Sequence, residues 1–284
     1  MIKFADQFQY FEKFKKSEFC LPDSWIVVRL DGKQFTRFTD FHGFDKPNDI
    51  RALELMNRAA AKVMEEFEDI CLAFGQSDEY SFVFKKDTDI FNRDRDTISS
   101  VVNSLFTSAY VFFWEHYFGY TKLLYPPGFD CRVVLYPCDS SLRDYLSWRQ
   151  ADVHINNLYN TAFWTLVKKG KHDRRKAQEI LRGTVSRDKN EILFKDFGIN
   201  YNNEPLMFRK GTTLIRKLVR CLKDDNCREC ILQLHCDIIG DSFWEENLEI
   251  LRQESPQLFH KPDGMVSYEV KSVSAVNVSN IAEE

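Results

Sequence analysis

The stretch Ile70-Cys-Leu-Ala-Phe-Gly-Gln-Ser-Asp-Glu-Tyr-Ser-Phe-Val-Phe84 sets four polar residues, Gln-Ser-Asp-Glu, between two largely apolar segments. The flanking segments, 70–75 and 80–85, have the length and the apolar and aromatic content of buried strands. A short polar connection between two such segments predicts a β-hairpin with Asp78 and Glu79 at its tip.

Segments on both sides of this hairpin predict the rest of the fold. Residues 25–31 and 131–136 are apolar, β-branched runs and are expected to be strands. Apolar residues at three- and four-residue steps predict amphipathic helices over 53–67, after a start signal at Pro47-Asn-Asp49, and over 98–113. The order βαββαβ predicts an α+β, ferredoxin-like fold, an antiparallel sheet with both helices on one face.

A third long helix is expected to begin near Ser141, because Ser141-Leu-Arg-Asp144 resembles a capping box. His154 and Asn157 are expected at the edge of its buried face. That face is predicted to carry Ile155, Leu158, Tyr159, Ala162, Phe163 and Leu166.

The charge of the chain is unevenly distributed. The formal net charge of −4 over 284 residues argues against bulk attraction to nucleic acid. Residues 168–189 nevertheless carry nine Lys or Arg against three acids, and residues 209–223 carry six against none. Such runs are usually solvated helix faces, and two of them also allow a local phosphate-binding surface.

Cysteine usage and hydropathy indicate the compartment. The start of the sequence has no apolar export segment and no long uncharged apolar run follows, so a cytoplasmic protein without membrane contact is expected, with a nuclear or mitochondrial pool left open. The eight cysteines then predict reduced thiols. Cys227-Arg-Glu-Cys230, with Cys221, His235 and Cys236 nearby, is an alternative zinc site that lacks a well-formed second Cys pair.

Asp31 and Asp78 are the candidate centre of the site, because this topology can place the end of the first strand beside the hairpin tip. Two carboxylates brought together repel each other unless a proton or a cation intervenes. Oxygen ligands without His or Cys favour Mg²⁺, and the carbonyl of Gly32 could add a further ligand. Two such ions would suit phosphoryl transfer.

Two other interpretations of the same residues remain open. Ser77, Asp78 and Glu79 could form an ordinary solvated turn. Tyr80-Ser-Phe-Val-Phe84 could instead be the aromatic strand of an RNA-recognition motif, in which rings stack on bases. Asp78 and Glu79 stand where that motif has a basic residue and glycine, so this second interpretation fits poorly.

Several segments together resemble the eukaryotic tRNA(His) guanylyltransferases, a family of 3′–5′ polymerases. The resemblance is carried in collinear order by Arg29-Leu-Asp-Gly-Lys-Gln-Phe35, Lys46-Pro-Asn-Asp49, residues 75–84, Tyr125-Pro-Pro-Gly-Phe-Asp130, Tyr145-Leu-Ser-Trp-Arg-Gln-Ala-Asp152, His154-Ile-Asn-Asn-Leu-Tyr-Asn-Thr161, Asp188-Lys-Asn-Glu-Ile-Leu-Phe194, residues 200–205, residues 209–211 and His235-Cys-Asp-Ile-Ile-Gly240.

The resemblance implies a nucleotidyltransferase with a polymerase-type palm that adds one guanosine to the 5′ end of tRNA(His). ATP would first activate the 5′-phosphate, and GTP would then be joined to it, with two Mg²⁺ ions bound. Residues 1–136 would form the catalytic palm-like domain, and residues 137–284 a helical, basic region that binds tRNA. The family also implies a homotetramer.

The resemblance assigns roles to individual residues. Asp31, Asp78 and the Gly32 carbonyl would hold metal, with Glu79 supporting them, and Arg29 and Lys46 would act on the phosphates during activation. The nucleotide would contact Asp31, Gly32, Lys33, Gln34, Phe35, Thr36, Lys46, Ser77 and Asp78. The tRNA would contact His154, Lys189, Asn200 and Lys210.

The sequence also departs from the family's pattern. Thr36 stands where close relatives often have histidine, and the basic cluster after the hairpin is reduced to Asn92-Arg-Asp-Arg95. Arg93 or Arg95 is expected to make the 5′-end contact instead. Alternatives to the main function are template-dependent repair of truncated tRNA 5′ ends and a non-catalytic RNA-binding module.

Overall fold

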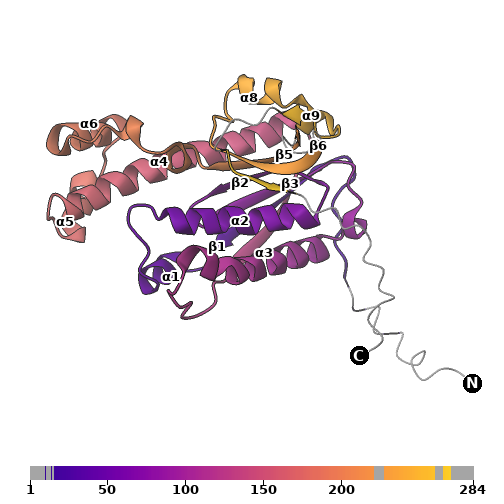
Figure 1. Ribbon diagram of the computed structural model, residues 1–284, viewed down its shortest axis with the longest axis horizontal. Coiled ribbons are helices and arrows are strands. Elements are labelled where there is room, and N and C mark those ends of the chain that lie inside the picture. The colour runs from indigo at the N-terminus through magenta and orange to yellow at the C-terminus, as the bar shows by residue number, and fades with distance from the viewer. Residues whose placement is uncertain (1–9, 11–13, 15, 221–226, 260–264, 270–284) are drawn as a thin grey trace, which may run out of the picture.

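The computed structural model describes residues 10, 14, 16–220, 227–259 and 265–269, and a single mixed sheet runs through its centre (Figure 1). The strands lie in the order β4-β1-β3-β2-β5-β6-β8, and β7 pairs with β5. Their bounds are β1 Trp25–Gly32, β2 Ile70–Gln76, β3 Glu79–Phe84, β4 Phe129–Tyr136, β5 Thr212–Arg220, β6 Cys227–Leu234, β7 Leu258–Phe259 and β8 Ser267–Glu269.

The first four strands confirm the expected βαββαβ order and the α+β class. They pair antiparallel as β4-β1-β3-β2, with helices α2 (Ile50–Glu66) and α3 (Arg95–Phe118) in the two crossovers. Helix α2 begins where predicted, since the Asp49 side chain accepts a hydrogen bond from the Arg51 amide. The hairpin is tighter than expected: Gln76 and Glu79 belong to the strands, so the turn is Ser77-Asp78 alone.

Both faces of the sheet are covered by helices. Because alternate residues of a strand point to opposite sides, one strand contributes to the core on each face. Ile26, Val28 and Leu30 of β1 pack in the cluster that contains α2 and α3. Trp25 and Val27 face the other way, into a cluster with helix α4 (Asp139–Lys168). The two predicted helices therefore share one face, and the third long helix covers the other (Figure 1).

Helix α4 continues past the sheet as an arm that carries α5 (Arg174–Leu181) and α6 (Ser186–Phe197) (Figure 1). Leu158 and Ala162 pack there against Leu193 in a cluster of their own. The helix begins two residues earlier than predicted, and Ile155 is exposed, so its assignment to the buried face was wrong. Smaller elements are α1 Phe35–Phe41, α7 Leu206–Lys210, α8 Asp241–Glu246, α9 Leu248–Arg252 and the 3-10 turns Ile90–Arg93 and Tyr201–Asn203.

Strands β5 and β6 join the edge of the first sheet, because β2 pairs antiparallel with β5. The described part of the basic run, residues 209–220, is therefore mainly strand, and two of its cations are buried. Arg216 donates to the carbonyls of Met64, Phe67 and Ile70, while Lys217 pairs with Glu249. These contacts correct the expectation of a solvated helix face there.

The remaining sequence expectations for the second half concern cysteines and membranes. Among the described residues, no group of three or more His, Cys, Asp or Glu is arranged to hold a metal, and Cys221 lies outside them. His235 instead contacts the Gly211 carbonyl at 3.0 Å. No helix in the described ranges is both long and apolar enough to cross a membrane.

Candidate active site

A cleft of about 680 Å³ opens between the hairpin tip, α1, the loop before α2, and α4. Its lining combines many polar and charged residues with the aromatic residues Tyr159, Phe163 and Trp164 of α4. Of the residues singled out from the sequence, it is lined by Arg29, Asp31, Phe35, Thr36, Lys46, Ser77, Asp78 and Glu79. The topology thus gathers into one site the end of β1, the hairpin tip and α4, which are distant in the sequence.

Asp31 and Asp78 meet at the floor of this cleft. Asp31 lies opposite Glu79 in the pairing of β1 with β3, and the Gly32 amide donates a 3.0 Å hydrogen bond to the Asp78 carbonyl. A methyl group placed on Gly32 would come within 2.7 Å of Asp78 Oδ2. Glycine at this position therefore leaves the space that the Asp78 carboxylate occupies.

The electrostatics of Asp31 and Asp78 favour a bound cation. Burial raises the pKa of Asp78 to about 6, and the negative charges of Asp31 and Glu79 push it in the same direction, against a hydrogen bond from Ser77. Burial also raises the pKa of Asp31, although the Arg29 guanidinium opposes this. Both carboxylates would ionise more readily beside a cation.

The donor set fits Mg²⁺. Two carboxylates and the Gly32 carbonyl offer hard oxygen ligands, and Mg²⁺ commonly takes the rest of its ligands from water and phosphate. Glu79 is a third carboxylate nearby, and its oxygens accept hydrogen bonds from the guanidinium groups of Arg29 and Arg149.

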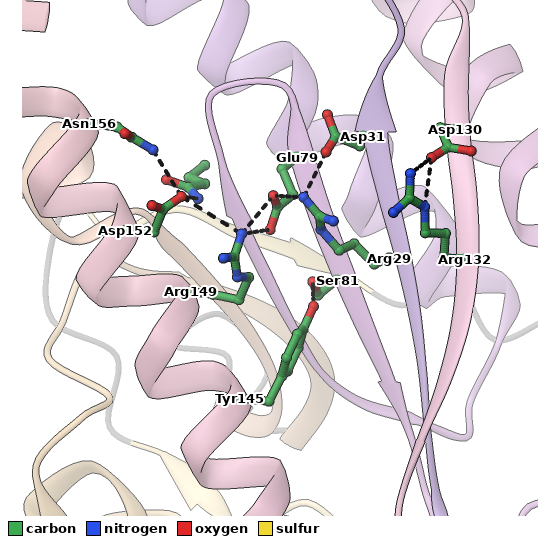
Figure 2. Close-up of polar contacts among 11 residues, drawn as sticks. Arg29, Asp31, Glu79, Ser81, Asp130, Arg132, Tyr145, Arg149, Asp152 and Asn156 are labelled. Carbon is green, nitrogen blue, oxygen red and sulfur yellow. Dashed lines mark hydrogen bonds and ion pairs between the residues drawn. The ribbon is translucent and has the colours of Figure 1, made fainter.

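Glu79 lies between two arginines (Figure 2). Arg29 Nη2 donates to Glu79 Oε2 at 2.5 Å and to Asp31 Oδ2 at 2.7 Å. Arg149 Nη1, from α4, lies 3.1 and 3.3 Å from the two Glu79 oxygens. The hydrogen bond to Glu79 is the main reason that the pKa of Arg29 is raised. Arg29 and Arg149 thus hold Glu79 in place, and Arg29 also holds Asp31.

Arg149 was missed by the sequence reasoning, although a signal was present. It falls on the stripe of α4 that also carries Leu142, Leu146 and Val153, all of them buried. A charged residue in an apolar stripe requires a buried partner. Helical periodicity could therefore have flagged Arg149 but could not have named Glu79.

The other residues predicted to contact the nucleotide lie at two separate cavities. Lys46 Nζ donates to Thr39 Oγ1 at 2.7 Å and lies 3.4 Å from Asp40, on the cleft wall. Phe35 also packs in the core, 4.9 Å from the Phe38 ring. Lys33 and Gln34 line a separate cavity of about 310 Å³ on the other side of α1.

The four candidate tRNA residues lie on α4, on α6, at the turn Tyr201–Asn203 and on α7. The His154 ring is 5.5 Å from that of Tyr201, which follows Asn200, and burial together with Lys210 lowers the pKa of His154. Lys210 pairs with Asp237. Lys189 belongs to α6, where its Nζ donates to the Thr184 carbonyl and lies 6.0 Å from the centre of the Tyr159 ring of α4. His154, Asn200 and Lys210 are thus gathered, and Lys189 stands apart.

Arg93 is not placed for the expected 5′-end contact. Its guanidinium donates to the carbonyls of Cys20, Leu21, Ser24, Lys86 and Thr88, which ties the chain before β1 to the loop after β3. Arg95 contacts Glu18 and the Val133 carbonyl. Arg93 is structural, and the expectation for it was wrong.

Comparison with known proteins matches two family models to this chain. One, described as tRNAHis guanylyltransferase, covers residues 8–137, and the other, described as the Thg1 C terminal domain, covers residues 140–240. A probable tRNA(His) guanylyltransferase of Bos taurus is 52% identical over an alignment of 265 residues that covers 88% of this chain and 89% of that protein. The chain belongs to the tRNA(His) guanylyltransferase family.

Other relatives agree in sequence and fold with this family. The tRNA(His) guanylyltransferase of Schizosaccharomyces pombe is 48% identical over 87% of this chain and 98% of its own. The crystal structure of the Saccharomyces cerevisiae enzyme matches with a TM-score of 0.71 and 47% identity, covering 73% of this chain and 92% of that one. A bacterial Thg1-like protein in complex with ATP, 20% identical, matches with a TM-score of 0.67 over 88% and 98% of the two chains.

Proposed function

We propose that this protein adds a guanosine to the 5′ end of tRNA(His). The observation that carries the proposal is the convergence of Asp31, Asp78 and Gly32 at the floor of a cleft, in a chain of this family. The 5′-phosphate oxygen of the tRNA would first displace pyrophosphate from ATP, which gives an adenylylated end. The 3′-hydroxyl of GTP would then displace AMP from it.

Two Mg²⁺ ions would be held by Asp31, Asp78 and the Gly32 carbonyl. When bound, they would neutralise phosphate charge on both the attacking and the leaving side. Arg29 and Lys46 would bring further positive charge to the phosphates from the cleft wall, where both side chains are partly exposed. Glu79 would keep Arg29 beside Asp31.

The nucleotide is proposed to contact Asp31, Phe35 and Thr36, from the end of β1 and the start of α1, together with Ser77 of the hairpin turn. Lys33 and Gln34 line the neighbouring cavity instead. This arrangement supports the description of residues 1–136 as a polymerase-type palm. Residues 137–284 would bind the tRNA through His154, Lys189, Asn200 and Lys210. We also propose a homotetramer; light scattering of the purified protein would measure the assembly directly.

The decisive experiment offers the protein a 5′-monophosphorylated tRNA(His) without the extra guanosine, together with ATP, GTP and Mg²⁺. The 5′ ends of the products are mapped, with tRNA(Phe) and 5′-truncated tRNAs in parallel. One G added to tRNA(His) alone supports the proposal. Extension of truncated tRNAs instead indicates template-dependent repair, and RNA binding without any addition indicates a non-catalytic module.

Two variants connect the activity to the site. Asp31→Ala and Asp78→Ala are each expected to abolish turnover, because each removes a shared metal ligand. Asp87→Ala is the matched control, since it removes an exposed carboxylate outside the cleft. Normal Mg²⁺-dependent addition by either cleft variant would contradict the metal assignment.

A further inference from the structure

We propose that Arg149 is a positioning residue that keeps the Arg29 guanidinium on Asp31 by sharing the charge of Glu79, and that it serves activation of the 5′-phosphate rather than the later transfer. This inference rests on the proposed function, since it assigns a task within that reaction. Arg149 is assigned no contact with the substrate. It would act through Glu79 and Arg29.

The geometry makes Arg149 a fixed part of the site. Its side chain is 5% exposed, its Nη1 contacts both Glu79 oxygens, and its guanidinium carbon lies 3.4 Å from the centre of the Trp148 ring. Asp152, one turn later on α4, is 3.8 Å from the same nitrogen. A planar guanidinium packed on a ring and held by carboxylates has little freedom to move.

The Arg29 guanidinium contacts two carboxylates, those of Asp31 and Glu79 (Figure 2). Both contacts of Arg29, to Asp31 and to Glu79, use Nη2, so its other nitrogens are not committed to either carboxylate. Removal of Arg149 would leave Arg29 as the cation that compensates a side chain only 10% exposed. Because a buried carboxylate attracts its remaining cation strongly, Arg29 would be drawn toward Glu79 and away from Asp31.

The two chemical steps differ in their need for this guanidinium. In activation, an anionic 5′-phosphate must approach the anionic triphosphate of ATP, so a cation near both lowers their repulsion. In the transfer step the nucleophile is the neutral 3′-hydroxyl of GTP. Displacement of Arg29 should therefore impair activation more than transfer.

The test compares two substrates of the same protein. A 5′-monophosphorylated tRNA(His) with ATP and GTP requires both steps, whereas a 5′-triphosphorylated tRNA(His) with GTP already carries pyrophosphate as leaving group and bypasses activation. Arg149→Gln is expected to lower the single-turnover rate on the first substrate on the order of 100-fold, the effect of misplacing a catalytic group by about 1 Å. On the second substrate the expected loss is below about threefold, within the modest range of a lost remote contact.

Controls separate a positioning role from a structural one. Arg143→Gln removes another arginine of α4, one that pairs with Asp241 at the surface, and should change neither rate. If Arg149→Gln does not fold, Arg149→Lys keeps the charge and is measured in the same way, with a larger loss expected on the monophosphorylated substrate.

Each outcome decides a separate question. Equal losses on both substrates, or no loss on either, would overturn the positioning role of Arg149 while leaving the proposed function intact. Failure of the unmodified protein to add G to either substrate would overturn the proposed function instead. Formation of radiolabelled adenylyl-tRNA from labelled ATP, without GTP, reports activation directly and must fall with the first rate.

Discussion

Substitution of Gly32 by alanine tests the geometry of the carboxylate pair directly. The added methyl group would lie 2.7 Å from Asp78 Oδ2 and 2.5 Å from a ring carbon of Phe35, whereas ordinary contact begins at about 3.4 Å. The Asp78 carboxylate must therefore retreat by roughly 0.7 Å, or the Phe35 ring and backbone must shift. Gly32 lies within strand β1, so the substitution tests space rather than an unusual backbone conformation.

A displacement of this size is expected to reduce the single-turnover rate by about 30- to 100-fold and to raise the Mg²⁺ concentration needed for half-maximal activity. Overpacking should also lower the free energy of unfolding by about 1–3 kcal/mol. Rates over a Mg²⁺ titration and a thermal melt measure both effects. Gly240→Ala is the matched control, because nothing lies within 4 Å of the added methyl group there. A rate within threefold of the unmodified protein, with an unchanged Mg²⁺ requirement, would refute the assigned geometry.

Three further predictions concern other residues. Because burial raises the pKa of Asp78 to about 6, the metal-free folded protein holds a proton that the unfolded chain has lost, so its stability falls as pH rises from about 4 through 6. In EDTA, Asp78→Asn should therefore melt higher than the unmodified protein at pH 8 but not at pH 4, and equal melting at both would contradict the raised pKa. Arg216→Gln should lower the free energy of unfolding by about 2–4 kcal/mol, measured in urea, because three carbonyls lose their donor. If the substitution also changes the salt dependence of tRNA binding, Arg216 contacts RNA and its role is not purely structural. His154→Ala should raise the KM for tRNA(His) about tenfold, the effect of one lost contact, and leave GTP binding unchanged; an unchanged KM in steady-state assays would remove His154 from the interface.

The N-terminal half was predictable because its signals are local and its topology rules are strict. The hairpin and its flanking strands show clear apolar runs, and the βαββαβ order then fixes which strand ends meet. That rule predicts that Asp31 lies near Asp78, and in the structure Asp31 lies opposite Glu79 while the neighbouring Gly32 amide donates to the Asp78 carbonyl. The length of the turn was wrong because strand pairing continues through Gln76 and Glu79, which local polarity conceals.

The second half was harder because its partners are distant in the sequence. Residues 212–220, Thr-Thr-Leu-Ile-Arg-Lys-Leu-Val-Arg, look like a basic surface segment, yet Arg216 and Lys217 are buried. Their charges are compensated by Glu229 on the neighbouring strand and by Glu249 on α9. Net charge along a run cannot show that its cations already have partners, which only the folded sheet supplies.

One helix connects the two ends of the proposed reaction. Within nine residues α4 carries Arg149, which holds Glu79, and Asn157, whose amide accepts from Asn48 at 2.9 Å and donates to Tyr201 at 2.9 Å. Asn48 lies two residues from Lys46, and Tyr201 contacts the His154 ring. Because a helix moves as a rigid unit, a displacement of α4 by bound tRNA would reach Glu79 and the Lys46 loop together. The proposed tRNA-binding arm and the catalytic cleft are therefore expected to respond to the same motion, and substitution of Asn157 should affect tRNA affinity and activation jointly.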